Sequence, residues 1–368
     1  MSSQLYSTKM DLGISSDSDV ELAIAEDLLP KPRRARNFLP RCFGDAIDEV
    51  TRRQQHRVPE AVVDYLEERL GPILQHRTQR NQPLTPRQQI ETFLHFTGTN
   101  CFFHLMRDAR GPSTHTVHRT VRRVTAAILT LKKEVIRWPN DMTKLRNDFM
   151  KIGNFPCVAG ALDGCHVIIT PPPDDETSYV NRHHSHSINV LAVSGPDLSF
   201  YYVNAEHPGS CHDGHVIRYS QLWRKFEDGN LPFPGAVLLG DSAYALRPWL
   251  LTPFPGQPEG AKLRYNIAHL RTRNVIERAF GVLKARFSCL KTGIRLRDPA
   301  ESSKLIVACT IVHNLCLKYG DADELSGGEE DGTNQGDQEE DDGEAEEGGS
   351  ERENRVRRQN QILATFMR

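Results

Sequence analysis

Two apolar runs of this chain each carry an aspartate beside a glycine, where a buried strand is expected. The stretch GALDGCHVIIT places Asp163 before Gly164 and then returns to apolar residues, and AVLLGD ends on Asp241. A carboxylate in such a position either forms a turn, for which Asp and Gly are well suited, or binds a cation. Taken singly, each aspartate favours the turn, so both interpretations remain open until further residues are placed.

The sequence around these aspartates alternates between strand-like and helix-like runs from residue 154 to residue 319. Alternating or continuous apolar runs predict strands, and apolar residues three and four apart predict helices. The predicted strands are 157–170, 186–195, 199–207 and 236–244, and the predicted helices are 215–228, 272–287 and 302–320. A loop rich in Pro and Gly covers residues 250–262. These elements predict an α/β domain in which successive strands are mostly antiparallel.

The part of the chain before this domain has a helical pattern instead, over residues 58–137. Thr85, followed by a proline, makes a favourable N-cap for one helix. A short break at residues 110–112, followed by Ser113 or Thr114 as a cap, separates two further helices.

The second helix of this last pair is basic. Arg119, Arg122 and Arg123 lie on it, and residues 81–137 hold nine Lys or Arg against three Asp or Glu. A helix, a tight turn containing glycine and a helix that starts at Ser or Thr have the form of a helix-turn-helix, whose second helix enters the major groove of DNA. An ordinary amphipathic helix pair gives the same pattern, so DNA binding by these arginines is one of two open interpretations.

Charge is distributed unevenly along the 368 residues. Residues 321–353 hold sixteen acidic residues and one arginine, which leaves 45 basic and 32 acidic residues elsewhere and a net charge of +13 there. A basic body suits a polyanionic partner, whereas the acidic, glycine-rich tail lacks the apolar residues needed to fold. The eight cysteines are scattered without a C-x-x-C pair, so we expect reduced thiols and neither a zinc ribbon nor a disulfide framework.

Four segments follow from these patterns. We expect a disordered or weakly structured N-terminal segment (1–57), a helical region with the helix-turn-helix (58–150), the α/β domain (151–320) and a disordered acidic tail with a short basic end (321–368). The stretch PKPRRAR is either a nuclear-import patch or a solvated linker, and the final NRVRRQNQILATFMR is either a docking helix or a frayed end. Without a membrane-length apolar run or a signal-peptide pattern, the chain is expected to be soluble and intracellular.

Four carboxylates fall at or near the ends of predicted elements, and they are Asp163, Asp213, Asp241 and Glu277. Carboxylates that end two neighbouring strands converge at one edge of a sheet, where they repel one another unless cations neutralise them. Mg²⁺ prefers such oxygen ligands, and two ions together stabilise the attacking and leaving oxygens of a phosphodiester displacement. As alternatives, Asp213 caps the helix that follows it, and Glu277 is an ordinary salt-bridge partner on a helix surface.

Two cations lie on the same predicted helix as Glu277. Arg273 stands one turn before it and Lys284 about two turns after it, so one helix face offers a metal ligand together with cations suited to the DNA phosphate backbone. Only the joint placement of the carboxylates and these cations favours a metal site over separate local roles.

Six motifs occur in one order: GALDGCHVIITPP, YVNRHHSHSINVLAV, HPGSCHDGHVIRYSQLW, LLGDSAYALRPWLLTPF, RNVIERAFGVLKARF and VACTIVHNLC. In order and spacing they resemble the PIF/Harbinger superfamily of DDE transposases and the nucleases derived from them, over about residues 85–317. The resemblance implies a ribonuclease-H-like core in which Asp163, Asp241 and Glu277 form the catalytic triad, with Asp213 as a further metal ligand. It also implies two divalent cations (Mg²⁺ or Mn²⁺), DNA as substrate, and a separate Myb-like or trihelix DNA-binding partner that assists nuclear entry.

The sequence departs from the family pattern at three places. His183, His184 and His186 replace a segment in which relatives commonly carry lysine, and three histidines on one loop raise the alternative of a zinc site there. Ala243, in GDSAY, replaces the glycine of the motif GDSGY that is frequent in relatives. Pro112 stands in the turn where relatives often carry an apolar residue. The last departure bears on how the recognition helix fits.

The resemblance favours a metal-dependent DNA endonuclease of transposase origin, acting in the nucleus and also present in the cytoplasm. Strand transfer and homo-oligomer formation are left open. The main alternative is a protein that kept the fold and the DNA-binding helices but lost the reaction, and a third is a nuclease acting on RNA, because fold and metal chemistry do not select the sugar. All four candidate ligands are present, so the sequence gives no sign of catalytic decay.

Overall fold

The computed structural model describes residues 49–78, 82–321 and 349–367, and all of them fall within one compact unit, Arg41–Arg368. The stretch PKPRRAR and most of the acidic tail therefore lie outside the described residues. Within the described ranges, no helix is both long and apolar enough to cross a membrane. The seven cysteines that these ranges contain are free thiols, as expected.

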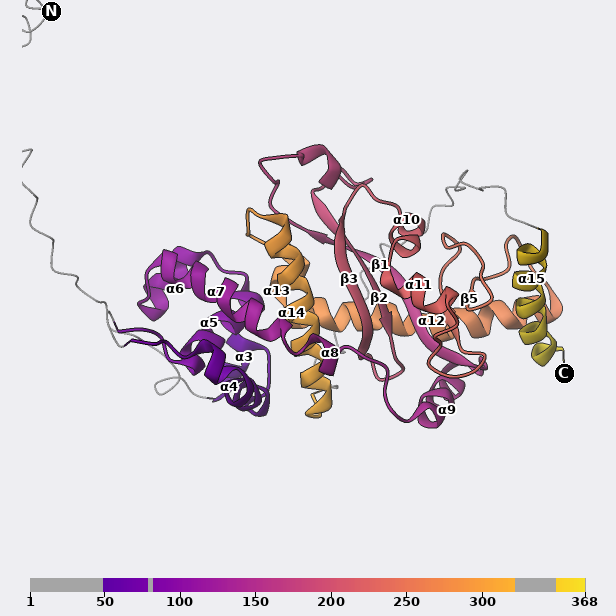
Figure 1. Cartoon of the computed structure of the whole chain (residues 1–368), viewed down its shortest axis with the longest axis horizontal. Coiled ribbons are helices and arrows are strands. Elements are labelled where there is room, and N and C mark those ends of the chain that lie inside the picture. Colours follow the sequence, from indigo (N-terminus) through magenta and orange to yellow (C-terminus); the bar gives the residue numbers. More distant parts are fainter. Residues whose placement is uncertain (1–48, 79–81, 322–348, 368) are drawn as a thin grey trace, which may run out of the picture. The chain divides into compact units, whose positions relative to one another are not determined.

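Five strands form one mixed sheet in the order β3-β2-β1-β4-β5 (Figure 1). They are β1 (Val158–Ile168), β2 (Ser187–Ser194), β3 (Phe200–Pro208), β4 (Val237–Leu239) and β5 (Leu250–Leu251). The neighbours β1, β2 and β3 are antiparallel, whereas β4 runs parallel to both β1 and β5. All four predicted strands are thus present, and β1, β2 and β3 keep nearly their predicted bounds. A mixed sheet flanked by helices is the ribonuclease-H-like arrangement that the resemblance implies.

Two strands differ from the prediction. β4 ends before Asp241 and does not continue to residue 244, because the Asp241 carboxylate accepts a 3.0 Å hydrogen bond from the Ala243 amide and closes a turn. Leu250 and Leu251 form β5 in a stretch predicted to be a loop. Two residues are too few to show a strand period, although both side chains are fully buried.

The helix that carries Glu277 is longer than predicted. α12 (Gly260–Arg286) packs against β1, β2 and α9 (Met142–Gly153). It begins at Gly260 and not at residue 272, and the buried side chains of Tyr265 and Ala268 attach this first part to the core. The length of α12 places Glu277 in mid-helix, beside the sheet.

The helix predicted at 215–228 is divided into α10 (Asp213–Arg218) and α11 (Gln221–Glu227). Ser220 separates the two because its hydroxyl accepts a 3.1 Å hydrogen bond from the Trp223 amide and caps α11. α10 lies beside the strands near one end of the sheet in Figure 1 and contacts β2.

In the described residues before α9, the helices are α3 (Glu49–His56), α4 (Glu60–Leu74), α5 (Pro86–Thr99), α6 (Phe103–Arg110), α7 (Thr114–Leu129) and α8 (Lys132–Val135). Thr85 caps α5 in a complete capping box with Gln88, and Ser113 caps α7 by accepting a 3.2 Å hydrogen bond from the Thr116 amide. Gly111 ends α6 in the left-handed conformation, with φ 90°. α6, this turn and α7 have the predicted helix-turn-helix form.

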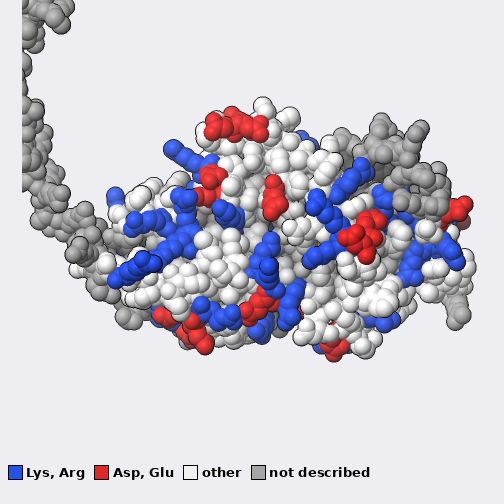
Figure 2. All heavy atoms as spheres, in the orientation of Figure 1, with Lys and Arg blue, Asp and Glu red and all other residues white. Residues whose placement is uncertain are grey.

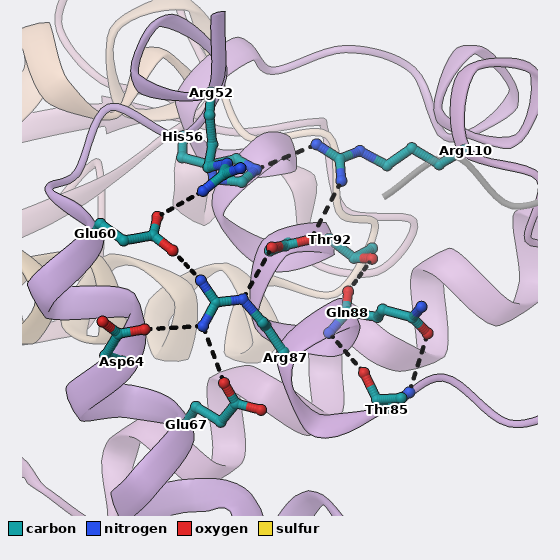
Figure 3. A network of polar contacts seen from close by, with 11 residues as sticks. Arg52, His56, Glu60, Asp64, Glu67, Thr85, Arg87, Gln88, Thr92 and Arg110 are labelled. Carbon is teal, nitrogen blue, oxygen red and sulfur yellow. Dashed lines mark hydrogen bonds and ion pairs between the residues drawn. The ribbon is translucent and has the colours of Figure 1, made fainter. Parts of the chain in front are cut away.

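Arg87 on α5 gathers carboxylates from two helices (Figure 3). Its guanidinium donates to Asp64 at 2.8 Å and to Glu67 at 3.0 Å, and it also pairs with Glu60, all three on α4. It lies 3.4 Å from Glu91 of its own helix, which is 2% exposed. These ion pairs join α4 to α5 beside the apolar core.

The helical region and the sheet share one hydrophobic core. Leu66 of α4, Val121 of α7, Ala161 of β1 and Ile311 of α14 (Pro299–Lys318) belong to the same cluster of buried side chains. The helix α14 packs against β3 on one side and α7 on another. The predicted boundary after residue 150 therefore separates two sequence patterns but not two cores.

The end of the chain forms α15 (Gly349–Leu363) and the short helix η3 (Ala364–Phe366). Leu363 and Phe366 are buried in a second apolar cluster, together with residues of β4 and β5. Arg264 of α12 donates a 2.6 Å hydrogen bond to the Phe366 carbonyl. Of the two interpretations for this segment, the structure shows the docked helix, inside a tail that was predicted to be disordered.

Candidate active site

Asp163 lies in the middle of β1, where its side chain is buried. Its backbone pairs with Ala192 of β2, and the residue is 6% exposed. The strand runs through this position without interruption, so the turn interpretation of Asp163 is wrong. The adjacent amide of Gly164 donates a 2.9 Å hydrogen bond to the carboxylate, which helps to fix the charge at one point of the sheet.

Asp241 follows β4, the parallel neighbour of β1. Ala161 and Leu239 are partners in the ladder between these strands, and each aspartate lies two residues beyond the partner on its own strand. This register brings Asp163 and Asp241 side by side, at the point where β4 ends and β1 continues along β2. The turn interpretation of Asp241 also holds, because its carboxylate accepts the hydrogen bond that closes the turn after β4.

Asp213 is the first residue of α10, but it does not cap that helix. The N-cap is His212, which makes no side-chain capping bond. The Asp213 carboxylate instead accepts a 2.7 Å hydrogen bond from the Asn189 side-chain amide. It also lies against Gly164, since a β-carbon built there would be 2.4 Å from Oδ1 of Asp213. The capping alternative is therefore wrong, and Asp213 lies beside Asp163.

Arg273 connects the sheet to Glu277. Its Nη1 donates to Oδ2 of Asp163 at 3.0 Å, and its Nη2 donates to the Glu277 carboxylate one turn further along α12. The Glu277 side chain is 41% exposed, whereas that of Arg273 is 14% exposed. Glu277 is thus a salt-bridge partner on a helix, as the alternative proposed, and through Arg273 it is also connected to Asp163.

The electrostatics of the site show an excess of negative charge. Burial raises the pKa of Asp163 to about 7, with Arg273 opposing the rise and the carboxylates of Asp241 and Asp213 adding to it. Burial also raises the pKa of Asp241, again against Arg273. One guanidinium therefore does not neutralise the group, and a further cation would favour the ionised forms.

The donor set fits a hard divalent cation, because Mg²⁺ and Mn²⁺ prefer carboxylate oxygens. The Tyr244 hydroxyl adds a second indication, since it is buried and has no hydrogen-bond partner in the described part of the chain. Burial raises the pKa of Tyr244, and the charges of Asp213, Asp163 and Asp241 raise it further, so the hydroxyl lies in their field. An orphaned buried hydroxyl beside carboxylates is suited to an ordered water or ion.

The predicted DNA-binding cations are placed on two elements. Lys284 lies on α12 with Arg273 and donates a 3.3 Å hydrogen bond from Nζ to the His166 carbonyl. Arg119, Arg122 and Arg123 lie on α7, which packs against α4, α5, α6 and α14.

The histidine-rich loop does not form a metal site in the structure. His186 lies 2.9 Å from the Glu176 carboxylate, and His183 and His184 are exposed. Among the described residues, these three do not bring their ring nitrogens together as a ligand group.

Two site residues were missed by the sequence analysis. Asn189 is 1% exposed and its amide donates to Asp213 and, at 2.9 Å, to the Cys211 carbonyl. Tyr244 supplies the orphaned hydroxyl. Both stand inside quoted motifs, SINV and GDSAY, but no local pattern shows that their side chains reach the carboxylates.

Comparison with known proteins adds an independent line of argument. The family described as DDE superfamily endonuclease matches residues 162–314. "Putative nuclease HARBI1" from Homo sapiens is 36% identical over 292 residues, which cover 78% of this chain and 83% of the relative. The Xenopus laevis protein of the same name is 33% identical over 267 residues (71% and 76%), and "Protein ALP1-like" from Arabidopsis thaliana is 22% identical over 303 residues (77% and 75%). No solved structure matches the chain.

The matched segment contains all four carboxylates of the site. The chain aligns with most of the length of relatives that are named as nucleases. The strand order of the sheet is the ribonuclease-H-like order that the resemblance implies. Fold, site and similarity agree on a nuclease of transposase origin. The chain belongs to the Harbinger transposase-derived nucleases, within the PIF/Harbinger superfamily of DDE transposases.

Proposed function

We propose that this chain is a metal-dependent DNA endonuclease in which Asp163, Asp241 and Glu277 hold divalent cations, Mg²⁺ or Mn²⁺, with Asp213 as a further ligand. The observation that carries the proposal is the convergence of Asp163 and Asp241 where β4 ends beside β1, with Asp213 packed against Gly164. Two such cations supply charge stabilisation for the attacking and leaving oxygens of a phosphodiester displacement.

The residues around the carboxylates have separate roles in this proposal. Asp163, held by β1, gives the site a rigid ligand, and the half-exposed Glu277 lies where a DNA backbone can approach. Arg273 pairs with both carboxylates, and its planar guanidinium is suited to a phosphate. Lys284 offers a second cation on the same helix, and no covalent protein nucleophile is required.

The helix-turn-helix supplies DNA binding in the proposal. Figure 2 shows Lys and Arg side chains at many points of one face, with fewer Asp and Glu side chains between them, in keeping with the basic charge outside the acidic tail. Arg119 is exposed, and Arg122 has a side chain that is 57% exposed although it pairs with Glu301. Arg123 donates a 3.0 Å hydrogen bond to the Ile73 carbonyl. We therefore assign phosphate contacts to Arg119 and Arg122 and a mainly packing role to Arg123.

The resemblance supports further parts of the proposal, namely action in the nucleus with some protein in the cytoplasm, and a Myb-like or trihelix DNA-binding partner. Replacing the acidic residues of 322–348 with Asn and Gln removes the negative charge and keeps the length of chain that leads to α15. If the tail contacts the basic partner, the replacement weakens partner binding; if it shields the basic body, the replacement strengthens non-specific DNA binding. No change in either affinity would remove the tail from the mechanism.

The test uses the purified full chain with labelled duplex DNA that carries candidate terminal repeats, in the presence of Mg²⁺ or Mn²⁺. Cleavage is expected with the natural sequence and is lost in both Asp163→Asn and Glu277→Gln. Glu259→Gln is the matched control, because Glu259 is an exposed glutamate at the start of α12 that makes no side-chain capping bond.

The same experiment separates the endonuclease from the adaptor alternative. An adaptor binds DNA through its basic residues, and its affinity falls steeply with salt whether or not Mg²⁺ is present. Salt-sensitive binding by a folded protein that cleaves neither DNA nor RNA with either metal would overturn the proposal. Cleavage of RNA alone would show that the site works on the other sugar.

A further inference from the structure

A second group of metal-ligand side chains lies on the loop that leads to Asp213. His207, Cys211 and His215 each offer one ligand atom, and these atoms all lie within 4.8 Å of one another. None of the three belongs to the carboxylate site, and the family resemblance assigns none of them a role.

The backbone between β3 and α10 brings the three side chains together. His207 is the next-to-last residue of β3. The chain then turns, and the Cys211 amide donates a 3.1 Å hydrogen bond to the Pro208 carbonyl. His215 lies in the first turn of α10, and its ring is nearly perpendicular to that of His207, with centroids 6.2 Å apart. The spacing H-x₃-C-x₃-H thus converges through a turn and a helix start.

The chemistry of this group differs from that of the carboxylate site. Two imidazoles and a thiolate form a nitrogen and sulfur set that suits Zn²⁺, whereas Mg²⁺ requires oxygen. The ligands of a tetrahedral zinc site lie roughly 3.5 Å apart, so small side-chain rotations close this group around an ion. His207 and Cys211 are half-buried and His215 is exposed, which leaves an ion a path from solvent.

The ligand atoms are also not committed elsewhere. In the described part of the chain, none of the three side chains makes a hydrogen bond or an ion pair with a neighbouring residue. By contrast, His186 of the histidine-rich loop faces the Glu176 carboxylate. The ordinary alternative is that two imidazoles pack together beside an unrelated thiol. It explains the ring contact but not why the Cys211 sulfur also lies within 4.8 Å of a nitrogen of each ring.

We propose that His207, Cys211 and His215 bind one zinc-type ion with three protein ligands and a fourth position open to solvent. Cys211 binds as the thiolate, so binding releases its proton to solvent. The ion would fix the loop from which Asp213 projects, because Asn189 pairs with His207 in the β2–β3 ladder and donates to both the Cys211 carbonyl and Asp213. The three ligands are thus positioning residues for Asp213.

The test is a titration of the full chain, stripped with a chelator, first with Co²⁺ and then with Zn²⁺. A thiolate-to-cobalt charge-transfer band is expected at one equivalent and disappears when Zn²⁺ displaces Co²⁺. The band is lost in Cys211→Ser and in His215→Ala. It is retained in Cys101→Ser and His183→Ala, which remove a half-buried thiol and an exposed histidine elsewhere. Asp163→Asn also retains it, since carboxylates give no sulfur band.

The outcome is readable whether or not the chain cleaves DNA. A folded protein that shows no band, or a band lost in Cys101→Ser or His183→Ala and kept in Cys211→Ser, overturns the zinc proposal. Circular dichroism checks the fold of each variant, and the exposed His215 serves if Cys211→Ser does not fold. The proposed nuclease function is judged separately, by cleavage in the Asp163→Asn and Glu277→Gln comparison.

Discussion

Gly164 and Asp213 occupy adjoining space so closely that any side chain at position 164 would displace the Asp213 carboxylate. A β-carbon there would lie 2.4 Å from Oδ1 and 2.8 Å from Oδ2 of Asp213, whereas real β-carbon contacts are ordinarily beyond 3.4 Å. The glycine sits in a regular strand, so close approach of the Asp213 carboxylate explains it and an unusual backbone conformation does not.

Gly164→Ala is therefore expected to displace the Asp213 carboxylate and to abolish most metal-dependent cleavage. The carboxylate stands at a helix start and can move aside, so the fold should survive. Gly281→Ala on α12 is the control, because nothing lies within 4 Å of its β-carbon and the change should stabilise the helix by up to about 1 kcal/mol. Cleavage rate and thermal midpoint are measured for both, and full activity in Gly164→Ala would contradict the role of Asp213.

The raised pKa of Asp163 predicts a pH dependence of stability in the presence of a chelator. Between its ordinary value of 3.8 and about 7, the folded protein retains a proton that the unfolded chain releases. The free energy of unfolding therefore falls as pH rises through this window. Asp163→Asn lacks this loss, so its stability advantage grows from near zero below pH 4 to its full size above pH 7, at most about 1.4 kcal/mol per pKa unit.

Urea unfolding across this pH range checks the prediction. Asp228→Asn, at an exposed aspartate, should run parallel to the natural protein. Adding Mg²⁺ above pH 7 should stabilise the natural protein more than Asp163→Asn, because a ligand that binds only the folded state adds to its stability. If the stability difference between Asp163→Asn and the natural protein stays constant with pH, burial does not raise the pKa of Asp163.

The two contrasting arginines of α7 predict different losses. Arg119 is exposed, so Arg119→Ala should change stability by less than about 0.5 kcal/mol while lowering DNA affinity and reducing the salt slope by about 1. Arg123 donates to the Ile73 and Gln75 carbonyls at the end of α4, so Arg123→Ala should cost about 1 kcal/mol of stability. Fluorescence anisotropy over a salt series and thermal unfolding separate the two. If Arg119→Ala and Arg123→Ala lower DNA affinity equally, Arg123 also contacts DNA.

What the sequence predicted well is local. The caps at Thr85 and Ser113 depend on a side chain and an amide three residues away, and β1, β2 and β3 are long enough to show their period. β5 has two residues and shows none, so it was placed in a loop. The division between α10 and α11 depends on Ser220, whose capping role competes with an apolar pattern that continues through it.

The sequence names candidate site residues but not their contacts. The family resemblance assigns Asp163, Asp241 and Glu277, and the β1–β4 register explains why the two aspartates lie close together. The pairing of Asp213 with Gly164 and Asn189 joins three separate elements, and no periodicity of one segment reports it. The bridge from Arg273 to Asp163 is likewise a long-range contact, invisible in a sequence that shows only its spacing to Glu277.

The contacts of Arg87 predict that the buried Glu91 carboxylate determines how much stability Arg87→Ala removes. Arg87→Ala should cost about 1–3 kcal/mol, because it removes the nearest cation from buried Glu91, whose pKa is raised mainly by burial and lowered by Arg110 and Arg87. Arg69→Ala, which breaks an exposed pair with Glu134, should have a much smaller effect on stability, because solvent screens such pairs. In a Glu91→Gln background the loss from Arg87→Ala should shrink towards the Arg69 value. Urea unfolding of the four variants measures this coupling. If Arg87→Ala removes as much stability in the Glu91→Gln background as in the natural protein, the loss comes from the α4 carboxylates and not from Glu91.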